Sequence, residues 1–424
     1  MDIKTYLVTK KEDIKNINVK PRLKEINITK DFIHSIIGPR RSGKSFYLYY
    51  LIKKLNLKEE DYLFVNFEDY VDFKDPFDFL IYHKEIYGKD PEYLFFDEIQ
   101  NLNNWEKFVY TLYESKRYYI FITGSSSKLL SKEIATSLRG RSISINIYPL
   151  SFKEIFFYEN VENKKLYSIY EEGKIRNIVN KYIYSQFPDI IFNNINPSDF
   201  FKIYLDLIVY KDIIDRYGIK NRYALELFIK SAITSFTKEF SIRKLFNTLR
   251  SQNIKVSKNL LYNFQKILED IQIFFFLRNY SKSLRKLELS IPKIHLVDPG
   301  LYNYIIEKDI GKTLENIVFL EFIKNGLEIN KNIFYFENNN YEIDFLIKEG
   351  NRITKLINVS YVNNFDEIDK REIRSLIHSY ELFKEHNPEL IIITWDYEDE
   401  KEISWFNKKG KIKFIPLYKW LLNI

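Results

Sequence analysis

The chain has 424 residues, of which 45 % are hydrophobic and 29 % charged, a composition typical of a folded protein with two or three domains. It has no cysteine, which excludes disulfides, thiol nucleophiles and thiolate metal sites. No apolar run approaches the ~20 residues that cross a bilayer, and residues 1–15 lack the apolar core of a signal peptide. We therefore expect a cytoplasmic protein that does not enter a membrane.

Short apolar runs alternate with helical patterns across residues 31–146. The runs are too continuous for half-exposed strands, and they suit a parallel sheet that helices cover on both faces. This segment therefore predicts an α/β domain. The runs read FIHSII, YLFVNF, YLFF, YYIFIT and SISINI.

The sequence GPRRSGKS at residues 38–45 matches the phosphate-binding pattern G-x-x-x-x-G-K-[ST], after the first apolar run and at the start of a predicted helix. Gly38 and Gly43 permit a tight turn that points backbone N–H groups inward at a positive helix end. Lys44 would neutralise the β- and γ-phosphates, and the Ser45 hydroxyl would ligate Mg²⁺. The expected nucleotide contacts are Gly38, Pro39, Arg40, Arg41, Ser42, Gly43, Lys44, Ser45 and Phe46. No Asn-Lys-x-Asp run follows, so ATP is the expected nucleotide.

The motif YLFFDEIQ at residues 93–100 is a predicted buried strand that ends in two carboxylates. Asp97 would hold Mg²⁺ through water, together with Ser45, and Glu98 would orient the attacking water. The next predicted strand ends in TGSSS, which places Thr123 and Ser125 as polar sensors of the γ-phosphate. An ordinary strand exit is the alternative for this turn.

The stretch SLRGR supplies two arginines, Arg139 and Arg141, that could neutralise charge on the transferred phosphoryl group, within one chain or from a neighbouring subunit. Structural surface arginines are the alternative. The expected catalytic residues are Lys44, Asp97, Glu98, Ser125, Arg139 and Arg141.

Residues 151–235 have a helical pattern and predict a lid or connector. The window 236–300 then holds twelve Lys or Arg and five acidic residues. Its net charge is therefore +7, as large as that of the whole chain. Two helices that begin at serines, SIRKLFNTL and SKNLLYNFQKILEDI, are followed by a basic, hairpin-like stretch, NYSKSLRKLEL. This order is typical of a winged helix-turn-helix.

The second of these helices has a polar face opposite its apolar face. The residues on it that could enter a DNA groove are Lys258, Asn259, Tyr262 and Lys266. A solvated face, or one that docks protein, is an equally supported alternative.

Residues 301–424 predict a small, separate α/β domain. The pattern gives helices over 311–325 and 369–384, and strands at NIFYF, EIDFLI, KLINVS and LIIIT.

Taken together, the ordered motifs GPRRSGKS, LFFDEIQ, FITGSSS, SLRGR, PLSF, EIDF and IPLYKWLL make the chain resemble a family of archaeal and bacterial AAA-type ATP-binding proteins. That family joins an AAA-like ATPase to a winged helix and a C-terminal domain similar to the PD-(D/E)xK nuclease fold. The resemblance implies ATP binding, slow hydrolysis and a switch role with an undefined client.

The expected fold class is therefore α/β, with an AAA-like P-loop parallel sheet, a helical and winged-helix module and a small restriction-endonuclease-like domain. The expected parts are an ATPase domain at 1–150, a helical lid or connector at 151–235, a winged helix at 236–300 and a nuclease-like domain at 301–424.

Nucleases of this fold need two or three carboxylates around Mg²⁺ and a lysine that stabilises the attacking hydroxide. Glu315 and Asp344 match the first two positions, whereas Asn358 stands at the third acid position and Ser360 where the lysine would stand. We therefore expect a catalytically degenerate site of Glu315, Asp344 and Asn358. Glu315 and Asp344 are then remnants, or partners of nearby cations.

The sequence as a whole favours a Mg²⁺-dependent ATPase that alternates between ATP and ADP and acts as a switch on an unidentified protein client. A homo-oligomer is one option, because the arginines could act between chains. An ATP-regulated DNA-binding protein or nuclease effector is the main alternative. A P-loop small-molecule kinase is a third, although it leaves the C-terminal modules unexplained.

Overall fold

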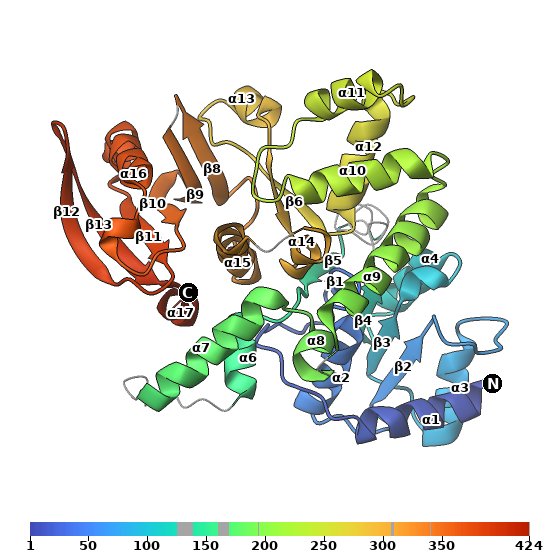
Figure 1. The fold of residues 1–424 in the computed structure, drawn as a ribbon. Coiled ribbons are helices and arrows are strands. Elements are labelled where there is room, and N and C mark those ends of the chain that lie inside the picture. Colours follow the sequence, from blue (N-terminus) through green and yellow to red (C-terminus); the bar gives the residue numbers. More distant parts are fainter. Residues whose placement is uncertain are drawn as a thin grey trace. The chain divides into compact units, whose positions relative to one another are not determined.

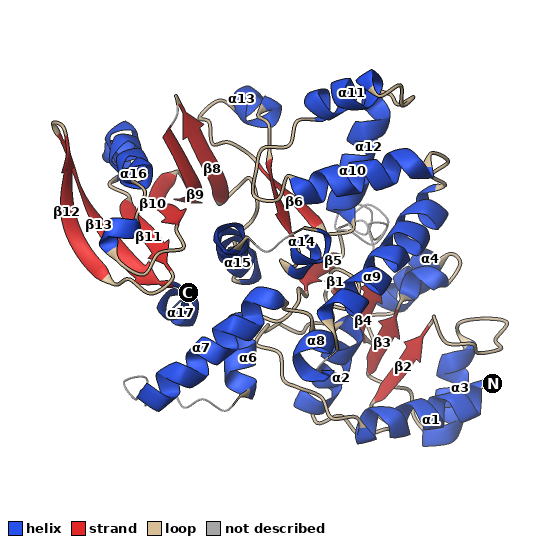
Figure 2. Ribbon diagram, in the orientation of Figure 1, coloured by secondary structure: helices blue, strands red, loops and turns tan. Residues whose placement is uncertain are grey.

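The computed structural model describes residues 1–124, 138, 140–159, 169–193, 195–306, 309–339 and 341–423. They form two compact units, Met1–Pro149 with Asp270–Gln272, and Leu150–Glu269 with Ile273–Ile424. Figure 1 follows the chain through both units, and Figure 2 marks their helices and strands. None of the described helices combines the length and apolar character needed to span a bilayer.

The first unit is built on a five-stranded sheet in which every neighbouring pair of strands is parallel. The strands are β1 (Ile33–Ile37), β2 (Tyr62–Asn66), β3 (Tyr93–Asp97), β4 (Tyr119–Gly124) and β5 (Ser142–Asn146). Their order across the sheet is β2-β3-β4-β1-β5, so β4 lies between β1 and β3. The predicted parallel α/β domain is confirmed.

Helices cover both faces of this sheet. Successive residues of a strand point to opposite faces, so an apolar strand places apolar side chains on both faces, and each face packs against helices. Leu94 and Phe96 pack with α1 (Ile3–Asn16), α3 (Asp78–Tyr87) and α4 (Trp105–Glu114). Phe95 points the other way, into the layer formed by α2 (Lys44–Lys54). Strands β1 to β4 are buried on both sides, which explains their largely apolar sequences. The edge strand β5 has only Ile145 buried, so its prediction as a strand covered on both faces is wrong.

The second unit begins with helices. These are α6 (Phe152–Tyr158), α7 (Ile169–Tyr184), α8 (Pro188–Asn193), α9 (Pro197–Leu207), a π-helix (Ile208–Asp215) and α10 (Arg222–Thr234). Capping residues in the sequence determine where several of these helices begin. Ser151 and Glu154 form a reciprocal capping box at α6, and Asn196 caps α9, whose first residue is a proline.

A two-stranded antiparallel sheet follows the two predicted helices α11 (Ile242–Ser251) and α12 (Lys258–Asp270). Its strands are β6 (Phe274–Leu277) and β7 (Lys293–Leu296). The basic stretch between them is wrongly predicted as hairpin-like, because it contains the short helix α13 (Leu284–Leu289). Ser283 starts this helix by accepting a hydrogen bond from the backbone N–H of Lys286.

The C-terminal part of the second unit holds a six-stranded mixed sheet in the order β12-β13-β11-β10-β9-β8 (Figure 2). Its strands are β8 (Ile333–Asn338), β9 (Tyr341–Glu349), β10 (Arg352–Val359), β11 (Glu389–Thr394), β12 (Asp399–Trp405) and β13 (Lys408–Pro416). The helices of this part are α14 (Gly300–Ile305), α15 (Ile310–Lys324), α16 (Lys370–Phe383) and α17 (Leu417–Asn423). The sequence prediction missed β12 and β13, whose charged and half-exposed residues give no apolar run.

Candidate nucleotide-binding site

The loop between β1 and α2 has the backbone of a phosphate cradle. Gly43 has φ of 92° and Arg41 has φ of 61°, so left-handed residues alternate with ordinary ones and turn the chain tightly. A Cβ atom at Gly38 would lie 2.1 Å from the carbonyl oxygen of Ile147, so only glycine fits there. The loop then runs directly into the N-terminus of α2, where unpaired N–H groups favour an anion.

Lys44 is held across this loop. It is 5 % exposed, and its Nζ donates a hydrogen bond of 3.0 Å to the carbonyl oxygen of Pro39. The backbone N–H of Ser42 points to the same oxygen at 3.3 Å. The ammonium is therefore already positioned over the cradle.

Arg22 braces the loop from outside and was missed by the sequence analysis. Its guanidinium donates to the carbonyl oxygen of Ser42 at 3.0 Å and to that of Tyr148 at 2.8 Å. No motif surrounds Arg22, so only the folded chain reveals that it fixes the shape of the loop.

Asp97 ends β3 and is completely buried. Its Oδ1 accepts a hydrogen bond from Thr123 Oγ1, and Thr123 Oγ1 in turn accepts one of 3.0 Å from the backbone N–H of Glu98. Thr123 lies near the carboxyl end of β4, the strand between β3 and the strand that leads into the loop. One hydroxyl therefore fixes both acidic residues at the carboxyl edge of the sheet.

The charge environment of Asp97 connects it with the loop. Burial raises the pKa of Asp97, while the hydrogen bond from Thr123, the Ser45 hydroxyl and the Lys44 ammonium act to lower it. Ser45 and Lys44 are thus close enough to act on this carboxylate. The structure therefore brings Lys44, Ser45 and Asp97 into one site.

The site fits a triphosphate with a divalent cation. Asp97 Oδ2 and Ser42 Oγ are buried, and neither has a hydrogen-bond partner within the part of the chain that the structure describes. Such atoms cost about 1–3 kcal/mol each unless a ligand satisfies them. An unsatisfied carboxylate oxygen is a suitable ligand for Mg²⁺ or for its bound water.

Comparisons with known proteins agree with this geometry. A family model described as an AAA domain matches residues 30–156, and a domain of unknown function matches residues 175–311. An uncharacterized protein of Methanocaldococcus jannaschii is 38 % identical over 94 % of this chain and 90 % of its own length. An uncharacterized protein of Haemophilus influenzae is 31 % identical over 93 % of this chain and 95 % of its own length.

The chain belongs to this family of AAA-domain proteins. Among solved structures, AMPPCP-bound DnaA of Aquifex aeolicus is 16 % identical, with a TM-score of 0.22 over 62 % of this chain and 87 % of that one. Aeropyrum pernix ORC1, solved in complex with DNA, is 11 % identical, with a TM-score of 0.25 over 77 % of this chain and 93 % of that one. The AAA-domain match over residues 30–156, together with the phosphate cradle after β1, makes the first unit a P-loop domain of AAA type.

Glu98 directly follows Asp97 in this AAA domain, in a left-handed backbone conformation with φ of 49°. A non-glycine residue held there costs about 1–3 kcal/mol, which the surrounding contacts must outweigh. Its backbone bonds to Thr123, and its carboxylate accepts a hydrogen bond from Gln100 Nε2. Its role in orienting water stays a prediction.

Of the three remaining predicted catalytic residues, the structure describes Arg141. Ser125 and Arg139 lie outside the described residues. Arg141 precedes β5 at the amino edge of the sheet, where its carbonyl accepts from the N–H of Ile33, whereas the phosphate cradle lies at the carboxyl edge. Its guanidinium pairs with Glu114 at 3.0 Å. Within one chain Arg141 is therefore away from the cradle, and action between chains stays a prediction.

The expected DNA-contacting residues share the solvent side of α12. Tyr262 is 55 % exposed, whereas Leu261, Phe264 and Leu268 are buried. The exposed residues of that side include Lys258, Asn259, Tyr262 and Lys266. A groove of about 560 Å³ beside them is lined by both basic and acidic side chains, among them Arg243 and Arg278 and also Glu269 and Glu288.

The expected degenerate nuclease residues are neighbours in the second unit. Asp344 N–H donates to Asn358 Oδ1 at 3.2 Å, and both Asp344 and Glu315 lie within ion-pair distance of Lys293. Lys293 is a residue that the sequence analysis did not connect with this site.

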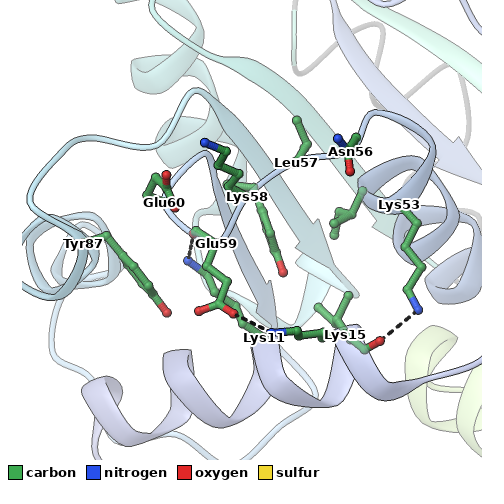
Figure 3. A pocket seen from close by; sticks show the side chains of 12 residues that line it. Lys11, Lys15, Lys53, Asn56, Leu57, Lys58, Glu59, Glu60 and Tyr87 are labelled. Atoms are coloured by element: carbon green, nitrogen blue, oxygen red, sulfur yellow. Dashed lines mark hydrogen bonds and ion pairs between the residues drawn. The ribbon is translucent and has the colours of Figure 1, made fainter.

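The first unit also contains a cavity of about 700 Å³ away from the phosphate cradle (Figure 3). Lys11 is buried at its wall, donates to the carbonyl oxygen of Glu59 and lies 3.7 Å from the ring centre of Tyr87. Burial lowers the pKa of Lys11 to about 7, although the charges of Glu59, Glu60 and Asp61 oppose this shift.

Replacing Lys11 by methionine should change how stability depends on pH. The pKa of Lys11 is lower in the folded chain than its usual 10.5, so the unfolded chain binds more protons between about pH 7 and pH 10. The free energy of unfolding should therefore rise over this range in the wild type, and less so in Lys11→Met. Chemical denaturation across the range measures this, with the exposed Lys15→Met as control. Equal slopes in all three proteins would contradict the prediction.

Proposed function

We propose that the protein is a Mg²⁺-dependent ATPase that works as a switch: ATP binds at the loop of residues 38–45, Glu98 orients the attacking water, and hydrolysis resets the state that a partner recognises. The observation that carries this proposal is the convergence of Lys44, Ser45 and the buried Asp97 at the carboxyl edge of one sheet.

Each residue has a distinct part in this proposal. The backbone N–H groups of the loop bind the phosphates, and the Lys44 ammonium exchanges the Pro39 carbonyl for phosphate oxygens. Ser45 and Asp97 would hold the magnesium ion, which when bound neutralises charge on the β- and γ-phosphates. The Thr123 hydroxyl holds the Asp97 carboxylate and the Glu98 backbone in place through its two hydrogen bonds.

The direct test is phosphate release from ATP by the purified full chain, measured with Mg²⁺ and again with excess EDTA. We expect turnover that EDTA abolishes, and ATP binding that is measurable by calorimetry. A folded protein that binds no ATP would end the proposal.

Replacing Thr123 by valine should separate positioning from binding. Valine keeps the shape but removes both hydrogen bonds, so Asp97 and Glu98 lose their shared support. Loss of such a supporting contact costs about 10–100-fold in activity. We expect a fall of that size in kcat with a small change in ATP affinity. Thr123→Ser, which keeps the hydroxyl, should stay near the wild type, and a fully active Thr123→Val would contradict the assignment.

DNA binding is a second candidate function, favoured by the solvent side of α12. The segment has two helices, a turn and a two-stranded sheet, the arrangement that we interpret as a winged helix-turn-helix, and the exposed side of α12 is polar. In this proposal that side of α12 enters a DNA groove, where Lys258 and Lys266 pair with phosphates along its edges.

The dependence of DNA affinity on salt tests this candidate. Each lysine–phosphate contact contributes about 0.9 to the slope of log K against log salt. The double variant Lys258→Ala and Lys266→Ala should therefore lower the slope by about 2, while Lys230→Ala on α10 should leave it unchanged. Binding whose salt slope is the same in wild type and double variant would remove α12 from the interface.

A further inference from the structure

Three carboxylates of the second unit surround one lysine. Lys293 on β7 is buried, and its Nζ lies 2.6 Å from Glu342 Oε1, 3.4 Å from Asp344 Oδ1 and 3.5 Å from Glu315 Oε1. Glu315 comes from α15, whereas Glu342 and Asp344 are two residues apart on β9 and so share a face. The ammonium thus occupies the point on which the three side chains converge.

Neighbouring contacts hold this arrangement in place. Asp344 Oδ2 accepts from the N–H of Val359 at 2.9 Å. On the lysine side, Asn316 of α15 bonds to both the N–H and the carbonyl oxygen of Leu296, at 2.9 and 3.0 Å, which ties β7 to the helix that carries Glu315. These two bonds therefore hold the backbone of β7, which carries Lys293, next to the helix that carries Glu315.

One positive charge does not balance this cluster. Burial acts to lower the pKa of Lys293, but Glu315, Asp344 and Glu342 outweigh it and hold that pKa well above its usual value. Burial also raises the pKa of Glu315 and of Asp344, even though the ammonium opposes the shift.

A further carboxyl group lies next to the cluster. Burial and then the charge of Asp344 raise the pKa of Glu372 of α16 to about 8, and its Oε2 is buried with no hydrogen-bond partner in the described chain. Several hard oxygen ligands around one cation are the chemistry of a Mg²⁺ or Mn²⁺ site. With Lys293 in place, however, no group of three acids or histidines among the described residues is spaced to hold a metal ion.

We propose that Lys293 is the resident cation of this cluster: its ammonium takes the place of a divalent metal ion, and Glu315, Glu342 and Asp344 become a Mg²⁺ or Mn²⁺ site only when the ammonium is removed. This goes beyond the proposed ATPase. A metal-dependent cleavage of DNA by this site is then excluded in the wild type.

Removing the ammonium tests the proposal. Mn²⁺ alone is added to nucleotide-free full chain after treatment with EDTA, and both bound Mn²⁺ and melting temperature are measured. We expect Lys293→Ala to bind Mn²⁺ at least about tenfold more tightly than the wild type, and to regain with Mn²⁺ much of the stability that the unpaired buried carboxylates cost it. Adding Asp344→Asn to Lys293→Ala should abolish the gain.

Lys324→Ala is the matched control. The Lys324 side chain is 6 % exposed and forms an ion pair with Glu321 alone among the described residues. Its ammonium also donates to the Leu150 carbonyl oxygen, the Tyr182 hydroxyl and the Gln186 side chain, so its removal should create no Mn²⁺ site. If Lys293→Ala is unfolded without metal, refolding in Mn²⁺ should restore it, and failure to do so overturns the proposal. A folded Lys293→Ala with no gain in Mn²⁺ binding, or a wild type whose Mn²⁺ binding is lost in Asp344→Asn, also overturns it.

Discussion

Replacing Lys44 by alanine is expected to lower the affinity for ATP at least about 100-fold, equivalent to roughly 3 kcal/mol. The Lys44 ammonium is buried above the phosphate cradle and acts on Asp97, so its removal takes away the charge that faces the triphosphate. The pKa of Asp97 should rise further at the same time, which weakens this carboxylate as a ligand for a cation. Calorimetric titration with ATP and Mg²⁺ measures the loss.

The matched control lies on the same helix. Lys53, in the last turn of α2, donates to the backbone carbonyl oxygens of Lys15 and Ile17 and should not contact the nucleotide. Lys53→Ala should therefore bind ATP as the wild type does, and circular dichroism should show both variants folded. Wild-type affinity in a folded Lys44→Ala would show that the phosphates bind elsewhere.

Replacing Glu98 by glutamine is expected to leave ATP binding intact while lowering hydrolysis at least about 100-fold, the contribution typical of a positioned general base. Glutamine has the same shape and keeps the backbone bond to Thr123. It can still accept a hydrogen bond from Gln100, so the strained backbone around residue 98 should survive. What it loses is the basic oxygen that orients and activates water.

Single-turnover phosphate release at saturating ATP measures this effect without interference from product release. Glu92→Gln is a suitable control, because Glu92 lies just before the opposite end of the same strand, where it pairs with Lys30 at 2.9 Å. The control should hydrolyse ATP normally. Hydrolysis by Glu98→Gln at the wild-type rate would assign the base to a different residue.

The sequence predicted the first unit well because its signals are local. A strand buried on both faces is largely apolar, so β1 to β4 could be located from their composition. The edge strand β5 was also located, although only Ile145 of it is buried. The phosphate cradle needs glycines at fixed positions beside a lysine, and the structure gives the reason at Gly38, where a Cβ would meet the backbone of Ile147. Asp97 was found because a polar residue directly after an apolar run marks a strand end.

The residues that the sequence did not predict act through contacts between distant segments. Arg22 supports the loop at Ser42 and the backbone at Tyr148, which lies 126 residues away. Lys293 reaches Glu315 and Asp344 only because β7 is bonded to α15. Neither interaction has a periodic or motif signal, since each depends on which elements the fold brings together.

The central claim is that Lys44, Ser45 and Asp97 hold a triphosphate together with a divalent cation. Equilibrium dialysis of Glu98→Gln, which should bind ATP without hydrolysing it, against Mn²⁺ with and without ATP tests it most directly. Protein-bound Mn²⁺ should appear only together with bound ATP, in equal amounts, and adding Asp97→Asn should reduce it. ATP retained by the protein without Mn²⁺, or neither retained at saturating concentrations, would contradict it.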